Sequence, residues 1–270
     1  MRMGEGYMEI TSLQNPRVKQ WAQLLEKKTR DKEHKYIIEG IHLVQEALIS
    51  GAPVECIVYS MEQGMPADIE KITASHLDVE WIGVTEAIIA KCSSTETPQP
   101  VFAVVHKQSS DMGALLEQEH ALVVVVDGVQ DPGNLGTIIR SADAVLADAV
   151  ILGKGTVDLY NPKTIRATMG SMFHLPVLEG NLHELLPAAK QSGARIVSTS
   201  LQAEHTCYAY DFRLSTWLLV GNEGKGVSAE VEDYVDDRII IPMPGRAESL
   251  NVAMATSVLL YEALRQRRYT

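Results

Sequence analysis

The sequence predicts an α/β protein whose larger, C-terminal domain is built on a parallel sheet. Strand-like segments alternate there with helical segments of roughly 10 to 15 residues, which is typical of a parallel sheet with helices on both faces. The first of them, residues 121–126 (ALVVVV), is apolar throughout, as a central parallel strand is. The chain has 270 residues, which favours two domains over one.

The turn after this first strand leads into an amphipathic helix. Residues 131–134 (DPGN) combine a proline, a glycine and an asparagine, so we expect a tight turn with Asn134 capping the helix. Arg140 lies outside the apolar stripe of this helix, near the edge of the sheet where ligands bind in open α/β folds. The stripe has spacings of three and four and consists of Leu135, Ile138, Ile139, Ala142 and Val145.

The remaining elements follow from the same patterns. In the second half we expect strands at residues 149–153, 195–199, 217–221 and 238–241, a short one at 175–178, and a last helix from Val252. In the first half we expect a helix from Ser12 to Leu25, strands at 36–40, 55–59, 78–82 and 101–106, and helices at 41–50 and 85–91. The polar stretch 107–120 predicts the linker, so the expected domains are 1–108 and 121–270, joined by 109–120, with a frayed leader at 1–10.

Composition limits the possible functions. The net charge of −11 argues against a non-specific nucleic-acid coat, but the stretch 15–36 holds seven basic and three acidic residues. Lys27, Lys28 and Arg30 in this stretch are candidate RNA contacts; a solvated helix face is the alternative. Three cysteines without CxxC spacing and scattered histidines predict no disulfide framework and no metal site. Without an apolar run of about 20 residues or a signal peptide, we expect a soluble, cytoplasmic protein.

Four stretches together resemble the signature motifs of the SpoU (TrmH-type) family of RNA ribose 2′-O-methyltransferases, in the SPOUT superfamily. Three are the main motifs, in the family's order: residues 127–144, 217–226 (WLLVGNEGKG) and 239–251 (IIIPMPGRAESLN). The fourth is 161–176, and the resemblance runs from about Ala121 to the end of the chain. The first half resembles the family's substrate-binding domain, through Asn15-Pro16, Glu39-Gly40 and Thr97-Pro98-Gln99.

The resemblance implies a fold and a cofactor. It implies a small ribosomal-protein-like α/β domain in the first half of the chain. It also implies a deep trefoil knot from about Thr199 to Asn251, although knots are essentially absent from proteins in general. It places S-adenosylmethionine in the knot loops, whereas the dinucleotide and P-loop spacings are missing. Gly221 would permit close backbone approach, and Ile241 and Leu250 would sandwich a base. The implied cofactor-binding residues are Thr199, Ser200, Leu201, Gly221, Asn222, Gly224, Ile241, Met243 and Leu250.

The resemblance also implies a reaction centre, made of Asn134, Arg140, Glu223, Ser249 and Asn251. The family presumes Arg140 to be catalytic, and general base is one reading of its role. Guanidinium stays protonated up to about pH 12, which favours an electrostatic clamp on a phosphate and the forming alkoxide. Glu223 would orient Asn134 or Arg140, and a plain turn carboxylate is the alternative. Ser249 and Asn251 would bind the ribose or the donor's carboxylate at the start of the last helix.

The implied protein is a homodimer that packs its last helix, Val252 to Arg265, against the partner copy and methylates structured RNA. The expected substrate is 23S ribosomal RNA, and transfer RNA is the second possibility. A SPOUT-like protein that binds structured RNA without methylating it is the competing class; an oxidoreductase lacks its fingerprint. The sequence does not indicate which nucleotide or base is modified, nor any role in antibiotic resistance.

Overall fold

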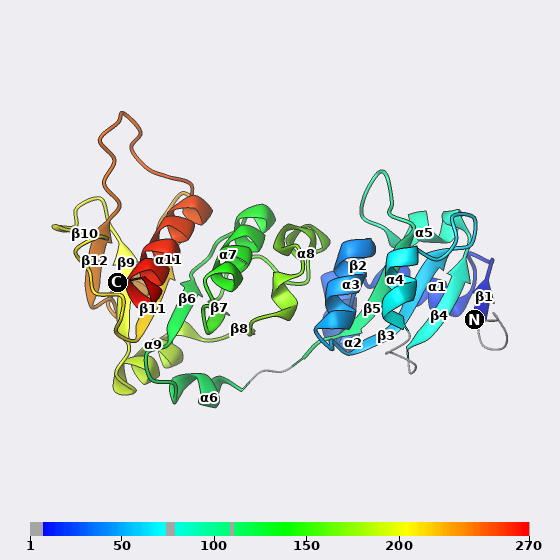
Figure 1. The fold of residues 1–270 in the computed structure, drawn as a ribbon, viewed down its shortest axis with the longest axis horizontal. Helices are drawn as coiled ribbons and strands as arrows, with labels where there is room; N and C mark the ends of the chain where they lie inside the picture. Colours follow the sequence, from blue (N-terminus) through cyan, green and yellow to red (C-terminus); the bar gives the residue numbers. More distant parts are fainter. Residues whose placement is uncertain (1–7, 74–78, 109–110, 270) are drawn as a thin grey trace. The chain divides into compact units, whose positions relative to one another are not determined.

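The computed structural model describes residues 8–73, 79–108 and 111–269 (Figure 1). The chain forms two compact units. Unit 1 comprises residues 1–108 together with 158–173, and unit 2 comprises 109–157 and 174–270. The contacts thus assign 158–173, a segment inside the C-terminal half of the sequence, to unit 1.

Unit 1 is a mixed five-stranded sheet in the order β1-β4-β3-β5-β2. The strands are β1 (Met8–Ile10), β2 (Lys35–Glu39), β3 (Val54–Ser60), β4 (Glu80–Val84) and β5 (Val101–His106). The helices are α1 (Pro16–Gln23), α2 (Lys27–Glu33), α3 (Ile41–Ile49), α4 (Ala67–Thr73) and α5 (Glu86–Cys92). Strand residues alternate between two apolar clusters: Ile37 and Val104 pack with α1 and α5, while Ile38 and Val105 pack with α3.

The segment 158–173 carries α8 (Pro162–Thr168) and the short 3-10 helix η1 (Ser171–Phe173), and it is folded into unit 1. Ile165 lies in the same apolar cluster as the residues of α3. Tyr160 packs its ring against Tyr36, with centroids 4.6 Å apart. Asp158 forms an ion pair with Arg30 at 2.6 Å, and the two side chains are only 10% and 4% exposed. Pairing lets these two charges be buried at acceptable cost.

Unit 2 is a seven-stranded sheet in the order β10-β12-β9-β11-β6-β7-β8, and every neighbouring pair is parallel. The strands are β6 (Leu122–Val126), β7 (Ala149–Leu152), β8 (Val177–Glu179), β9 (Arg195–Thr199), β10 (His205–Thr206), β11 (Thr216–Val220) and β12 (Asp237–Ile240). β6 and β11 are buried along their whole length, because they lie inside the sheet and both faces are covered.

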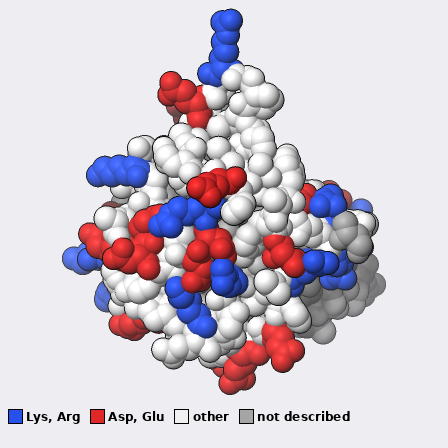
Figure 2. Space-filling view, turned by 90° about the vertical axis from the view of Figure 1, so that its left-hand side faces the viewer, with Lys and Arg blue, Asp and Glu red and all other residues white. Residues whose placement is uncertain are grey.

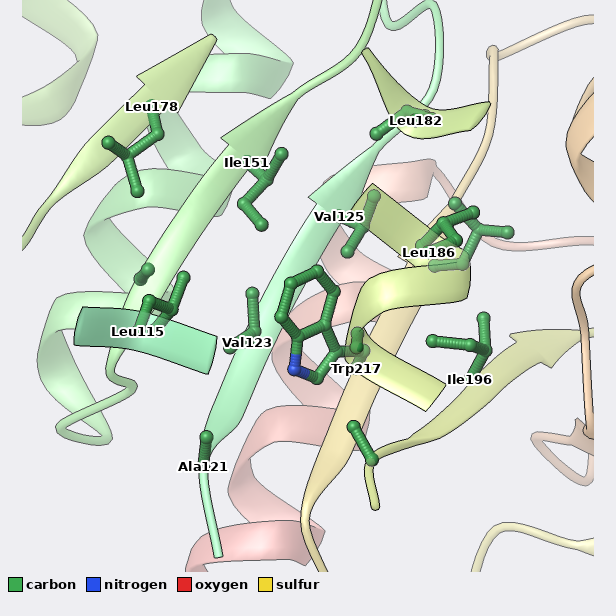
Figure 3. Close-up of a cluster of buried hydrophobic side chains, with 14 of the residues drawn as sticks. Leu115, Ala121, Val123, Val125, Ile151, Leu178, Leu182, Leu186, Ile196 and Trp217 are labelled. Atoms are coloured by element: carbon green, nitrogen blue, oxygen red, sulfur yellow. The ribbon is translucent and has the colours of Figure 1, made fainter. Parts of the chain in front are cut away.

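Helices cover both faces of this sheet (Figure 1). On one face, α6 (Met112–Leu116), α9 (Leu182–Gln191) and α10 (Ala229–Glu232) enclose a cluster around Trp217, whose indole lies among Val123, Val125 and Ile196 (Figure 3). On the other, α7 (Pro132–Ala144) packs against α11 (Val252–Arg268), and the hydroxyls of Ser141 and Ser257 are 2.7 Å apart.

The predicted α/β class and parallel sheet are confirmed. The strands expected at 101–106 and 195–199 have those bounds, and the other predicted strands begin or end within two residues of the prediction. The strand expected at 78–82 is Glu80–Val84. Three parts of the predictions lie outside the described residues: Asp78 of this strand, 1–7 of the expected leader and 109–110 of the expected linker. The later part of that linker forms α6, with Leu115 buried in unit 2. β1 and β10 were not predicted, and the knot stays a prediction.

Candidate active site at the carboxyl edge of the parallel sheet

Three loops of unit 2 meet where parallel strands end. Residues 127–131 follow β6, residues 221–228 follow β11, and residues 241–251 connect β12 to α11. β6 and β11 are neighbours, so their loops emerge side by side. The third loop rises well beyond the strand ends in Figure 1. This edge is where open α/β sheets bind their ligands.

The loops after β6 and β11 are tied together by two hydrogen bonds. The Asn222 side chain donates to the carbonyl of Gly128 at 2.8 Å, and the backbone N–H of Ser228 donates to the buried Asp127 carboxylate at 2.7 Å. Asn222 also accepts from the N–H groups of Gly224 and Lys225, which closes its own loop. The role of Asp127 was not predicted; its position directly after an apolar strand was the available signal.

Glu223 is an acceptor for three donors from the first motif. Its carboxylate accepts hydrogen bonds from the side-chain amide of Asn134 at 3.0 Å and from the backbone N–H groups of Gln130 and Asp131 at 3.2 and 3.1 Å. Burial by itself raises the pKa of Glu223, but the bonds from Asn134 and from backbone N–H groups outweigh it, so the pKa lies below its ordinary value. Glu223 is therefore ionised at neutral pH and orients Asn134, one of the two residues proposed for it.

Asn134 links Glu223 to the third motif. The side-chain N–H of Asn251 donates to the carbonyl oxygen of Asn134 at 3.0 Å. Asn251 is the N-cap of α11, and its own side-chain oxygen accepts from Ala253 N–H at 2.9 Å and Met254 N–H at 3.3 Å. Since an ionised carboxylate only accepts, this chain of bonds fixes both amides in one orientation. The relay Glu223–Asn134–Asn251 thus joins all three motifs.

The cap of α7 differs from the prediction. Asp131, not Asn134, is the N-cap, and its carboxylate accepts from the N–H of Asn134 at 2.8 Å. Pro132 takes the first helical position, where its missing N–H costs nothing. Asn134 therefore lies within the first turn, which leaves its side chain available for the relay.

Arg140 is exposed on α7 and is not part of the relay. Arg140 lies six positions after Asn134, a rise of about 9 Å along the helix axis. In the part of the chain that the structure describes, Arg140 has no hydrogen-bond or ion-pair partner, so Glu223 does not orient it. Ser249 is also exposed, two residues before the Asn251 cap. The structure brings together three of the five expected reaction-centre residues within unit 2 and leaves Arg140 and Ser249 facing solvent.

The expected cofactor residues follow three adjacent strands, β12, β9 and β11. Leu201 and Leu250 are 55% and 41% exposed, and Ile241 and Met243 are half-buried. Exposed apolar side chains at a strand edge fit the adenine of S-adenosylmethionine. The remaining expected residues lie at the same ends and are half-buried or exposed, so the set fits the group: Thr199, Ser200, Asn222 and Gly224.

Glycine is required at position 221 for a different reason from the expected one. A Cβ there would lie 2.1 Å from the backbone carbon of Gly226 and 2.2 Å from the nitrogen of Val227. Asn222 and Gly226 also exchange backbone hydrogen bonds of 2.9 Å. The close backbone approach that requires glycine is therefore within the loop itself.

The candidate RNA contacts of unit 1 divide into two kinds. Lys27 and Lys28 are exposed on α2. Arg30 is only 4% exposed, because its guanidinium donates to the carbonyls of Leu24 and Leu25 and pairs with Asp158. Arg30 therefore supports the fold of unit 1, and we leave it out of the RNA surface.

Figure 2 shows a face of unit 2 on which basic and acidic side chains are interspersed. Unit 2 also contains ion pairs between such side chains, for example Arg195–Asp237 and Lys190–Asp236, at 2.7 and 2.8 Å. A face of mixed sign attracts phosphate weakly.

Comparisons with known proteins agree with this geometry. Residues 121–261 match the SpoU rRNA Methylase family and residues 15–103 match the MRM3-like substrate binding domain. The chain is 40% identical to a Bacillus subtilis protein named 23S rRNA (guanosine(2553)-2′-O)-methyltransferase RlmP, covering 94% of this chain and 98% of the relative. It is 32% identical to the 23S rRNA (uridine(2479)-2′-O)-methyltransferase of Streptomyces viridochromogenes, covering 96% and 92%.

Solved structures give the same result. An AdoMet-bound rRNA methyltransferase from Sinorhizobium meliloti is similar with a TM-score of 0.87 at 34% identity, covering 98% of this chain and 99% of that one. The SpoU methyltransferase AviRb from Streptomyces viridochromogenes, in complex with AdoMet, has a TM-score of 0.86 at 31% identity, covering 95% and 99%. The predicted resemblance is confirmed: the chain belongs to the SpoU rRNA methylase family.

Proposed function

We propose that this protein is an S-adenosylmethionine-dependent RNA ribose 2′-O-methyltransferase acting on 23S ribosomal RNA in the cytoplasm. The observation that carries the proposal is the Glu223–Asn134–Asn251 relay, which joins the loops after β6, β11 and β12 in a chain of this family. Relatives named for 23S rRNA 2′-O-methylation, similar over almost the whole chain, support the substrate.

The side chains at this edge have separate tasks. When bound, S-adenosylmethionine supplies an electrophilic methyl group. Gly221, Ile241 and Leu250 would hold the cofactor. The relay keeps the side-chain amides of Asn134 and Asn251 in fixed directions. Arg140, exposed and unpaired among the described residues, binds the phosphate beside the target ribose and stabilises the forming alkoxide. Ser249 hydrogen-bonds the ribose, whose proton passes to solvent.

We further propose that the protein is a homodimer with α11 in the interface. Met254, Val258 and Tyr261, at spacings of four and three on this helix, are 53%, 37% and 55% exposed. They form one apolar face with Leu250 in the preceding loop, and such a face is typical of a protein interface.

The test compares 2′-O-methylation in total RNA from cells with and without the gene, followed by transfer of labelled methyl groups from S-adenosylmethionine to the unmodified RNA by purified protein. We expect one 23S nucleotide to lose its methyl group in the deletion strain and to regain it in vitro. A transfer RNA site would change the substrate, and binding to RNA without methyl transfer would favour the non-catalytic class.

A further inference from the structure

Unit 1 brings three segments that are distant in sequence around one narrow crevice. Its lining includes Leu25 just before α2, Ser94 in the loop after α5, and Pro162 and Arg166 of α8. The other lining residues are Ile37, Glu39, Cys92 and Ile165. Residues 158–173 lie outside the region that matches the substrate-binding domain and inside the region 121–261 that matches the methylase family.

A buried carboxylate organises the loop Ser93–Gln99 on one side of this crevice. Glu39 accepts from the hydroxyls of Ser93 and Thr95 at 2.7 and 2.8 Å and from the N–H of Gln99 at 3.3 Å. Its side chain is 9% exposed. The motif residues Glu39 and Gln99, which the catalytic site does not use, therefore hold a surface loop in one conformation.

Arg166 of α8 reaches the same loop. Its Nη1 donates to the hydroxyl of Ser94 at 2.7 Å, and its ion pair with Glu39 is long, at 4.0 Å. The side chain is 35% exposed, and a guanidinium has five N–H groups, so donors remain for a second acceptor. Lys163, three residues before Arg166, is exposed, and this spacing places the two residues on the same face of α8.

The lining of the crevice holds one basic side chain, Arg166, and one carboxylate, Glu39, and further charges lie on the elements that carry the lining residues. Lys27 and Lys28 begin α2 two and three residues after Leu25, and with Lys163 and Arg166 they give four cations. Three carboxylates lie in the same segments: Glu26 and Glu96 are exposed, and Glu39 accepts from the hydroxyls of Ser93 and Thr95. The exposed Lys163 and the partly exposed guanidinium of Arg166, which lie on one face of α8, fit the phosphate backbone of a nucleic acid.

We propose that α8 and the Glu39-held loop extend the RNA-binding surface of unit 1, with Arg166 and Lys163 contacting backbone phosphates and Glu39 acting as a positioning residue. This inference rests on the proposed function, because it takes structured ribosomal RNA as the ligand. The segment 158–173 then serves RNA capture, although it lies between β7 and β8 in the chain.

The test measures binding of the full-length protein to deproteinised 23S RNA from the deletion strain, at several KCl concentrations. The double variant Lys163→Gln/Arg166→Gln should bind about tenfold more weakly, and the slope of log Kd against log salt should fall by about 2, since each lost phosphate contact removes about 1. The KM for RNA should rise, while kcat at saturating RNA and the affinity for S-adenosylmethionine stay unchanged. Glu39→Gln should weaken binding less, because it loosens the loop and leaves the four cations in place.

Two control variants separate RNA contact from a structural role. Lys71→Gln removes an exposed lysine of α4, outside the crevice, and should leave both the affinity and the salt slope unchanged. Ser94→Ala breaks the bond to Arg166 but keeps its charge, so binding should stay within about twofold of wild type. If Ser94→Ala instead reproduced the loss seen in the double variant, Arg166 would be a brace for the loop and the proposal would be rejected.

The outcomes also separate this proposal from the proposed function. Wild-type protein that methylates the RNA, with a double variant of unchanged affinity and slope, would overturn the RNA surface alone. Wild-type protein that transfers no methyl group, but loses binding in the double variant, would overturn the enzymatic function and keep the surface. Equal RNA affinity of wild type and double variant would reject the surface in either case.

Discussion

Glu223, in the loop after β11, accepts a hydrogen bond from the side-chain amide of Asn134, in the first turn of α7, at 3.0 Å. The two residues are 89 positions apart in the sequence. They meet because β11 and β6 are neighbours in the sheet, and their bond sets the direction in which Asn134 faces Asn251.

Glu223→Gln should destabilise the protein in a pH-dependent way. The variant keeps the shape but replaces one acceptor oxygen with an NH₂ group, so it loses at least one of the three bonds and weakens the others. We expect a loss of about 1 kcal/mol at pH 7, discounted for exposure. Because folding lowers the pKa of Glu223, its contribution is complete above the ordinary value of 4.5 and is lost as pH falls through the folded value. Thermal unfolding of both proteins between pH 7 and pH 3.5 should show the difference shrinking in acid, and a constant difference would contradict this account.

Asn134→Asp and Asn251→Asp should differ in severity. Asn134→Asp places a second carboxylate against Glu223, and the repulsion should cost about 2 kcal/mol and most of the activity. Asn251→Asp retains an oxygen that caps α11 as well as asparagine does, but it replaces the donor to Asn134 with an oxygen that faces the Asn134 carbonyl oxygen. We expect a loss of about 1 kcal/mol for it in chemical denaturation, smaller than for Asn134→Asp, because no second carboxylate is opposed. Equal losses of stability in the two variants would mean that the amides of Asn134 and Asn251 are not held in one orientation.

Arg140→Ala should lower turnover about 100-fold, as loss of one preorganised donor does, with the affinity for S-adenosylmethionine unchanged in calorimetry. Arg140→Lys should recover part of the activity, because it keeps the charge and loses the planar fork. A pH–rate profile of the lysine variant separates the two roles. Activity equal to wild type at high pH would indicate a general base, since lysine has a pKa near 10.4. Full activity of the alanine variant would exclude both roles.

Gly221→Ala should unfold the loop after β11, since its Cβ would lie 2.1 Å from backbone atoms that have no room to move. We expect a loss of about 3 kcal/mol or more, together with loss of cofactor binding. Gly245→Ala is the matched control in the next loop, where a Cβ meets nothing within 4 Å. Urea unfolding curves of the two variants check the contrast.

The dimer predicts a mass near twice 29.7 kDa in light scattering at micromolar concentration. Val258→Lys should shift this to the monomer mass, because it places a charge in the centre of the apolar face of α11. Tyr269→Lys, at a 77% exposed position after the helix, is the control and should leave the mass unchanged. A wild-type protein that is monomeric would show that α11 is covered in some other way.

The sequence by itself determined the class of fold and the positions of the motifs. Short apolar runs rich in valine, such as 121–126, predict strands buried on both faces, and the Pro132 turn with the helical spacing after it marks the start of α7. The family could be identified because three short motifs, each following such a strand, retain their order.

Only the tertiary structure decided which motif residues touch. Glu223 selects Asn134 over Arg140 because strand order places the loops after β11 and β6 side by side, and no local pattern encodes strand order. In the sequence, Arg30 belongs to the same basic run as Lys27 and Lys28. In the structure it is buried, because it pairs with Asp158, 128 residues away in the chain. The assignment of 158–173 to unit 1 likewise depends on packing of Ile165 and Tyr160 against distant residues, since folding follows buried contacts and not the order of the chain.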